Sequence, residues 1–129
     1  KLVKTTYESM IAGIGAMKDG GRFGDIGEAV EKVASREKFG VVRILGGHAI
    51  GRHIHEEPFI PNYGKRGTGP FIKKGMLLAI EPMLNQGGDE VYLDRKDGYT
   101  FRTLDGSLSA HFEHTVLITK EGAEILTVV

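Results

Sequence analysis

The chain has 129 residues, enough for one domain with a single hydrophobic core. Lys and Arg together number 17, as do Asp and Glu, so no net charge attracts the chain to nucleic acid or to an anionic membrane. It has no cysteine for a disulfide or a thiolate metal site, and no apolar run of roughly 18 residues that could span a bilayer. We therefore expect a cytoplasmic protein without nucleic-acid or membrane partners.

The first segment predicts a helix that ends at Asp19-Gly20-Gly21, because glycines break helices. Thr5 and Glu8 have the spacing of a capping box, unless the helix begins earlier and runs through them. Apolar side chains recur in this segment at helical spacing, at Tyr7, Met10, Ile11, Ile14 and Met17. The chain starts without Met inside this pattern, so we expect it to be part of a longer protein.

A second helix is predicted from near Asp25, with Glu28 three residues on, to Gly40. Its buried stripe would consist of Ile26, Val30 and Val33, with Ala29 and Ala34 beside them. A short strand over residues 41–45 should follow.

Residues 46–75 are rich in Gly, His and Pro, and we expect them to lack regular structure. A connection of this length is uncommon unless it carries a function. Strand-like runs then follow at residues 76–83, 90–93, 99–103, 110–119 and 124–128. Two helices before several strands predict an α+β fold, in which the helices pack on one face of a mainly antiparallel sheet and the other face is free for chemistry.

Four residues stand out for their chemistry. His48 lies between small residues that let the backbone bend around a compact ligand such as a metal ion, and His55 follows seven residues later. Glu81 and Glu113 lie inside apolar strand-like runs. An ionised carboxylate in such a place is costly unless it is paired or bound to a metal.

Strand alternation places His111, Glu113 and Thr115 on one face. If Glu81 lies on a neighbouring strand, both carboxylates can converge with His48, a ligand set that suits Mn, Fe, Co or Zn. Each residue also has a simpler explanation, because a histidine near glycines often belongs to a turn or the core, and a glutamate before proline often ends a strand. His111 and His114 are expected to support the ligands rather than to act as ligands. Composition and spacing alone do not establish a metal site.

Taken together, six segments resemble the central signature of type I methionine aminopeptidases, and they follow in the right order. They are residues 47–52 (GHAIGR), 55–58 (HEEP), 62–64 (NYG), 74–76 (KGM), 80–83 (IEPM) and 109–115 (SAHFEHT). Proline-specific aminopeptidases and creatinase-like enzymes share this fold, but their motifs typically read Glu-Pro-Gly and Glu-Asp. Glu81-Pro82-Met83 and Glu113-His114-Thr115 favour the methionine enzymes.

The resemblance implies that residues 1–129 form the C-terminal half of a pita-bread catalytic domain whose N-terminal half is absent. It implies two divalent ions in the parent enzyme, Co, Mn, Fe or Zn. His48 and Glu81 match ligands of one ion, Glu81 also matches a group that moves protons, and Glu113 matches a bridging ligand. His55 matches the histidine that hydrogen-bonds the substrate near the scissile amide. Ile54 and Tyr99 fall where larger aromatic side chains often wall the methionine pocket.

The implied activity is removal of the initiator methionine from nascent proteins by a metalloprotease, an activity that would belong to the full-length parent. Its partners would be N-terminal Met peptides, the missing half, and the ribosome as a further candidate. Two aspartate ligands and one histidine of the family precede the matching region, so we expect this chain alone to be inactive and to hold at most one ion weakly. The alternative is a non-catalytic half-domain that serves in binding or assembly.

Overall fold

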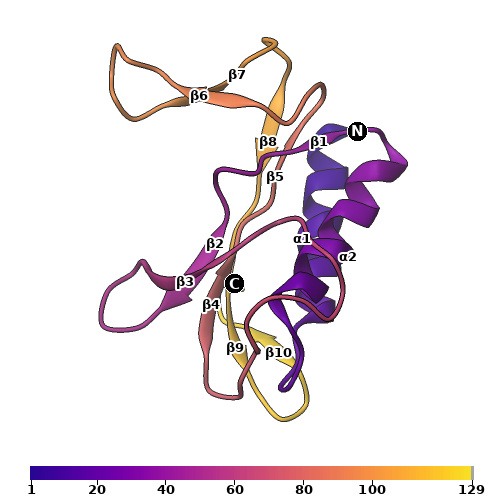
Figure 1. Cartoon of the computed structure of the whole chain (residues 1–129), viewed down its shortest axis with the longest axis vertical. Helices are drawn as coiled ribbons and strands as arrows, with labels where there is room; N and C mark the ends of the chain where they lie inside the picture. Colours follow the sequence, from indigo (N-terminus) through magenta and orange to yellow (C-terminus); the bar gives the residue numbers. More distant parts are fainter. Residues whose placement is uncertain (129) are drawn as a thin grey trace.

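In the computed structural model, which describes residues 1–128, two helices lie against one face of antiparallel strands (Figure 1). Helix α1 spans Leu2–Ala16, and buried Thr5 lies within it. The predicted cap at Thr5 is therefore wrong, and the alternative of a helix running through this position is correct. The helix approaches the sheet closely at Gly13, where an added Cβ would lie 2.5 Å from Cδ1 of Ile80.

Helix α2 spans Phe23–Arg36, so it begins slightly before Asp25 and ends before the predicted Gly40. The Asp25 carboxylate lies in its first turn and accepts hydrogen bonds from the backbone N–H groups of Arg22 (2.9 Å) and Gly67 (2.7 Å). These bonds, the first being the stronger influence, lower the pKa of Asp25. The start of α2 thus also fixes the loop around Gly67.

All the strand pairs are antiparallel, as predicted. The larger sheet has the order β10-β9-β4-β2-β3, formed by β2 (Gly47–Ile50), β3 (Glu56–Ile60), β4 (Leu77–Ile80), β9 (His114–Ile118) and β10 (Ala123–Ile125). A smaller sheet has the order β1-β5-β8, formed by β1 (Gly40–Val41), β5 (Met83–Asn85) and β8 (Ser109–His111). Strands β6 (Val91–Leu93) and β7 (Phe101–Thr103) form a two-stranded hairpin that projects from the rest of the chain (Figure 1).

One long antiparallel ribbon joins the two larger sheets. Its register pairs Ile80 with His114 in β4 and β9, and the same register continues as Met83 with His111 in β5 and β8. Between these pairs the strands are interrupted, and Phe112 N–H donates to the Pro82 carbonyl at 3.4 Å. The two strand-like runs predicted at 76–83 and 110–119 are therefore each two strands, with the break at the glutamate motifs.

Two predictions near the middle of the chain are wrong. The strand predicted over 41–45 is limited to β1, and the stretch 46–75 contains the paired strands β2 and β3. Glycine lowers strand propensity, but here it permits close approach between strands. An added Cβ at Gly46 would lie 2.7 Å from the Ile60 carbonyl oxygen, and one at Gly47 would collide with the Ala79 carbonyl oxygen.

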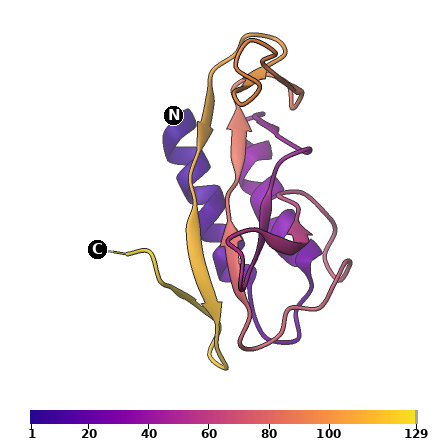
Figure 2. The ribbon, with the colours of Figure 1, turned by 90° about the vertical axis from the view of Figure 1, so that its left-hand side faces the viewer.

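The hydrophobic core lies between the helices and the sheet. It contains Met10, Ile14, Met17, Phe23, Ile26, Ile60, Ile72, Leu78, Ile80, Val116 and Ile118. Since side chains alternate along a strand, the neighbours of Leu78 and Ile80 point away from the helices. Figure 2 shows the strands in front and the helices behind them, so the opposite sheet face is not covered by a helix. Within residues 1–128, no helix is both long and apolar enough to cross a membrane.

The turn of the β6–β7 hairpin is organised by Asp97. Its carboxylate accepts hydrogen bonds from the N–H groups of Tyr99 and Thr100, both at 2.9 Å, and from the Thr100 hydroxyl at 2.6 Å. These bonds, above all the hydroxyl's, lower the pKa of Asp97 to about 2. These hydrogen bonds also fix the backbone at Tyr99.

Helix α1 and strand β8 leave apolar side chains and a strand edge exposed on one side of the chain. Helix α1 exposes a stripe at helical spacing, formed by Val3, Tyr7 and Ile11. Beside it lies β8, which is an edge strand of the smaller sheet, and the Tyr7 ring meets the Phe112 ring edge-on at 5.5 Å. Open strand edges and apolar patches favour association with other chains.

The Asp97 turn should be sensitive to acid. Because its folded-state pKa of about 2 lies below the usual 3.8, the carboxylate stabilises the turn above pH 3.8, and this contribution is lost as the pH falls through about 2. The amide resonances of Tyr99 and Thr100 should titrate in NMR spectra with that low midpoint, and Asp97→Asn should abolish the titration. A midpoint near 3.8 would contradict this assignment.

The open surface should make the isolated chain self-associate. Sedimentation at micromolar concentrations should detect dimers or larger species, and Tyr7→Lys with Ile11→Lys should shift the population toward monomer by placing charge in the stripe. Ile44→Lys is the matched control, since Ile44 is also exposed but lies outside α1. A wild-type chain that stays monomeric would show the prediction to be wrong.

Candidate metal centre

His48 lies on the sheet face opposite the helices. It pairs with Ala79 of β4, which in turn pairs with Thr115 of β9, so the three residues form a row across the sheet. His48 itself is buried, and its Nδ1 lies 3.0 Å from the Ala49 carbonyl oxygen. A carbonyl oxygen can only accept, so Nδ1 carries the proton and the Nε2 lone pair is available to a metal ion.

The two glutamates lie one step beyond the last regular pair of β4 and β9. That pair is Ile80 with His114, so the ribbon register brings Glu81 opposite Glu113 on the face that carries His48. The ligand atoms of His48, Glu81 and Glu113 all lie within 4.8 Å of one another. The sequence-based expectation that these three residues converge is therefore correct.

The chemistry of this group fits a divalent cation. Glu81 is only 13% exposed, and its Oε1 lies 3.4 Å from Nε2 of His48. A largely buried carboxylate beside a second carboxylate is costly unless a cation balances the charge. One imidazole nitrogen with two carboxylates is a ligand set for Mn, Fe, Co or Zn.

Two further residues contact Glu81. Buried Asn62 donates a hydrogen bond from Nδ2 to the Glu81 backbone carbonyl at 3.1 Å. His111 approaches the other side of the carboxylate, with Nε2 3.3 Å from Oε2. The sequence includes both residues in motifs but gives Asn62 no role, because its contact with Glu81 depends on the path of the chain between β3 and β4.

His55 lies at the exposed end of the loop that precedes β3, beside the three-residue group. Its ring centre is 4.3 Å from that of His48, with a tilt of 49° between the planes. The loop thus carries a second imidazole to the entrance of the group. The contact with substrate that the family resemblance implies for His55 stays a prediction.

A hollow of about 470 Å³ lies next to this group. It is lined mostly by apolar side chains, from Val42, Leu45, Met83, Val91, Tyr99, Thr100, Phe101, Thr103, Ser109 and His111. His111 therefore borders both the hollow and Glu81. Tyr99 belongs to the wall although its side chain is 86% exposed. The lining drawn from residues 1–128 does not include Ile54, which is 71% exposed.

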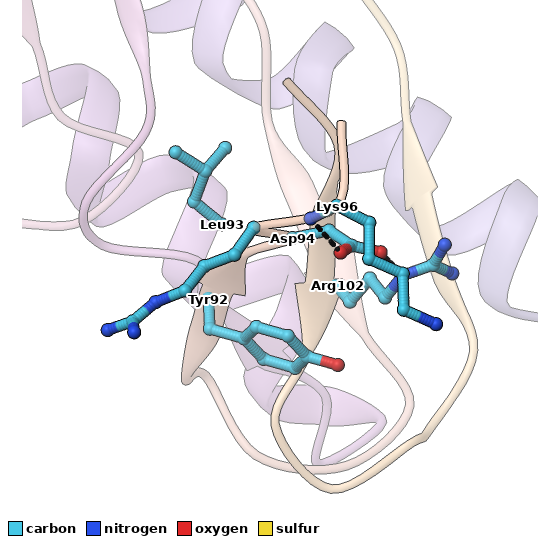
Figure 3. A pocket seen from close by; sticks show the side chains of 6 residues that line it. Tyr92, Leu93, Asp94, Lys96 and Arg102 are labelled. Carbon is cyan, nitrogen blue, oxygen red and sulfur yellow. Dashed lines mark hydrogen bonds and ion pairs between the residues drawn. The ribbon is translucent and has the colours of Figure 1, made fainter. Parts of the chain in front are cut away.

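A second hollow, of about 870 Å³, lies on the β6–β7 hairpin and is lined by Tyr92, Leu93, Asp94, Arg95, Lys96 and Arg102 (Figure 3). The Asp94 carboxylate accepts hydrogen bonds from Arg102 Nε at 2.7 Å and from Lys96 N–H at 2.9 Å. The bond from Arg102 is the main cause that lowers the pKa of Asp94. This basic hollow shares no residue with the His48 group.

The sequences of known proteins match the chain along most of its length. The profile of Metallopeptidase family M24 matches residues 1–120. Methionine aminopeptidase B of Synechocystis is 52% identical over 127 residues, which cover 98% of this chain and 46% of that protein. The methionine aminopeptidase of Rickettsia prowazekii is 46% identical over 127 residues, covering 98% of this chain and 49% of its own length.

Solved structures show the same relationship. The methionine aminopeptidase of Rickettsia prowazekii superimposes with a TM-score of 0.95 at 46% identity, covering 98% of this chain and 51% of that one. The enzyme of Thermotoga maritima gives 0.94 at 48% identity, covering 99% and 51%. Prolidase of Pyrococcus horikoshii gives 0.71 at 19% identity, covering 99% and 31%, and shares the fold alone.

These likenesses confirm the expected α+β architecture, in which two helices pack on antiparallel strands as in part of the pita-bread fold. The chain spans about half the length of the curated relatives that it matches. Since the family profile covers residues 1–120 and the fold agrees, the chain belongs to Metallopeptidase family M24.

Proposed function

We propose that residues 1–129 form the C-terminal half of a methionine aminopeptidase catalytic domain, and that the complete enzyme removes the initiator methionine from nascent proteins. The observation that carries the proposal is the convergence of His48, Glu81 and Glu113, whose ligand atoms lie within 4.8 Å of one another. The sequence around them is 52% identical to a methionine aminopeptidase over 127 residues. The two family aspartates would come from the remaining half.

In this proposal, His48, Glu81 and Glu113 would hold the divalent metal together with ligands from the other half. Bound Co, Mn, Fe or Zn would supply an activated water and polarise the scissile carbonyl. The Glu81 carboxylate would accept a proton from water and deliver it to the leaving amine. Its burial keeps it close to the reacting groups and away from bulk solvent.

The substrate would enter beside His55. From its place above the His48 ring, His55 would donate a hydrogen bond to the substrate at the scissile amide as charge develops there. The methionine side chain would occupy the apolar hollow that includes Tyr99, and Ile54 would meet the substrate from the exposed loop before β3. An apolar hollow next to polar reactive groups is the usual form of such a subsite.

The natural partners in this proposal are N-terminal Met peptides of nascent chains and the other half of the catalytic domain. Because nascent chains emerge from the ribosome, we place the enzyme in the cytoplasm with the ribosome as a transient partner. The exposed α1 stripe and the β8 edge also support the alternative, a non-catalytic module for assembly, since both are surfaces that another chain can cover.

The metal centre can be tested on the 129-residue chain. Titration with Co²⁺, followed by absorption and calorimetry, should detect one weak site that a chelator empties. Glu81→Gln or Glu113→Gln should weaken the affinity by at least about tenfold, because each removes a charged ligand. Glu121→Gln, in the exposed turn before β10, should leave it unchanged. Equal affinities in all four proteins would contradict the ligand assignment.

The activity can be tested in a chimera in which residues 1–129 replace the matching half of the Thermotoga maritima enzyme, which is 48% identical. With Mn²⁺ the chimera should release methionine from a Met-Gly peptide, and His55→Ala should lower kcat/KM by about 100-fold. The chain alone should release none.

The parent Thermotoga enzyme serves as the positive control for this assay. A folded, metal-loaded chimera without activity would favour the non-catalytic module. Activity of the 129-residue chain by itself would contradict the dependence on the other half.

A further inference from the structure

The Glu81 carboxylate is contacted by a different imidazole at each oxygen. Oε1 lies 3.4 Å from Nε2 of His48, and Oε2 lies 3.3 Å from Nε2 of His111. The first contact belongs to the metal-ligand group, whereas the group found within residues 1–128 does not include His111. His111 therefore has a contact with a ligand residue that the proposed reaction does not use.

The strand register delivers His111 to this place. His111 pairs with Met83 in the β5–β8 segment, two residues from Glu81 on the same ribbon. Alternation then turns His111, Met83 and Glu81 to the same face. The His111 side chain is 45% exposed and Glu81 only 13%, so the imidazole covers the carboxylate from the solvent side.

We infer that His111 is a positioning residue, which holds the Glu81 carboxylate with Oε1 turned toward His48 and the metal-ligand group. The inference rests on the proposed function in assigning Glu81 to the metal. The terminal torsion of glutamate is broad, so a single contact leaves the carboxylate free to rotate. A second contact at Oε2 restricts that rotation before any metal arrives.

The effect does not require a change of charge on His111. Nε2 can donate its proton from the neutral Nε2–H tautomer as well as from the imidazolium form. Groups that orient a metal ligand typically contribute about 10- to 100-fold to metal affinity. His111 would thus contribute to the strength of a site to which it supplies no ligand atom.

His114 provides a matched comparison within the same motif. It lies three residues from His111, and its Nδ1 is 2.7 Å from the Thr127 hydroxyl rather than near Glu81. Replacing His114 therefore changes the same ribbon but removes no contact of the Glu81 carboxylate. A change that appears when His111 is replaced, but not when His114 is replaced, therefore reflects the contact between His111 and Glu81.

The first measurement uses NMR of the metal-free chain. The two Hγ protons of Glu81 should be resolved in the wild type, because the side chain is held in one orientation. His111→Leu and His111→Ala remove the N–H donor and should bring the two resonances together. His111→Gln keeps an N–H donor and should keep them apart, as should His114→Ala. Melting curves confirm that each variant is folded.

The second measurement is the Co²⁺ affinity of the same proteins. The Leu and Ala variants of His111 should bind at least about tenfold more weakly, and the Gln variant should stay within about threefold of the wild type. The inference is overturned if the Hγ resonances stay separate in folded His111→Leu or His111→Ala, if they merge in folded His111→Gln, or if His114→Ala has the same effect as His111→Leu.

The two proposals fail separately. If the wild-type chain binds no Co²⁺ while the Hγ resonances respond as expected, the metal centre fails and the positioning of Glu81 by His111 stands. If Co²⁺ binds and is lost in Glu81→Gln but the His111 variants match the wild type in both measurements, the metal centre stands and the positioning role is wrong.

Discussion

The site depends on one register, that of the antiparallel ribbon formed by β4–β5 and β8–β9. This register places Glu81 opposite Glu113, an arrangement that two carboxylates do not favour by themselves. On the reverse face of the same strands, Leu78 and Val116 pair within the core beneath the helices. Because a slip of one residue would expose this apolar set, the core fixes the register and holds the carboxylates together.

Sequence reasoning could predict the parts of the site that depend on local patterning. Strand alternation alone places Glu113 on the same face as His111. The apolar residues around Glu81 mark its carboxylate as unusual. The strand that carries His48 could not be predicted, because glycine-rich segments are typical of loops. Here the glycines instead allow close packing with Ala79 and Ile60. Helix α2 also begins and ends earlier than predicted, and its start is marked by the hydrogen bond from the Arg22 backbone N–H to the Asp25 carboxylate rather than by the apolar pattern.

Contacts between segments that are far apart in the sequence could not be predicted from local patterning. Asn62 reaches the Glu81 backbone and His111 reaches its carboxylate only because the chain folds back on itself. The motifs contain both residues without indicating their partners. The hollow beside Tyr99 likewise needs the hairpin, β5 and the segment after β1 to come together, and the sequence gives the composition of its wall but not its closure.

The β6–β7 hairpin pairs as a sheet of its own, apart from the ribbon that holds the glutamates. Its residues Val91, Tyr99 and Phe101 nevertheless line one side of the apolar hollow. Substitutions there can therefore reshape what the hollow accommodates while the ligand atoms keep their positions.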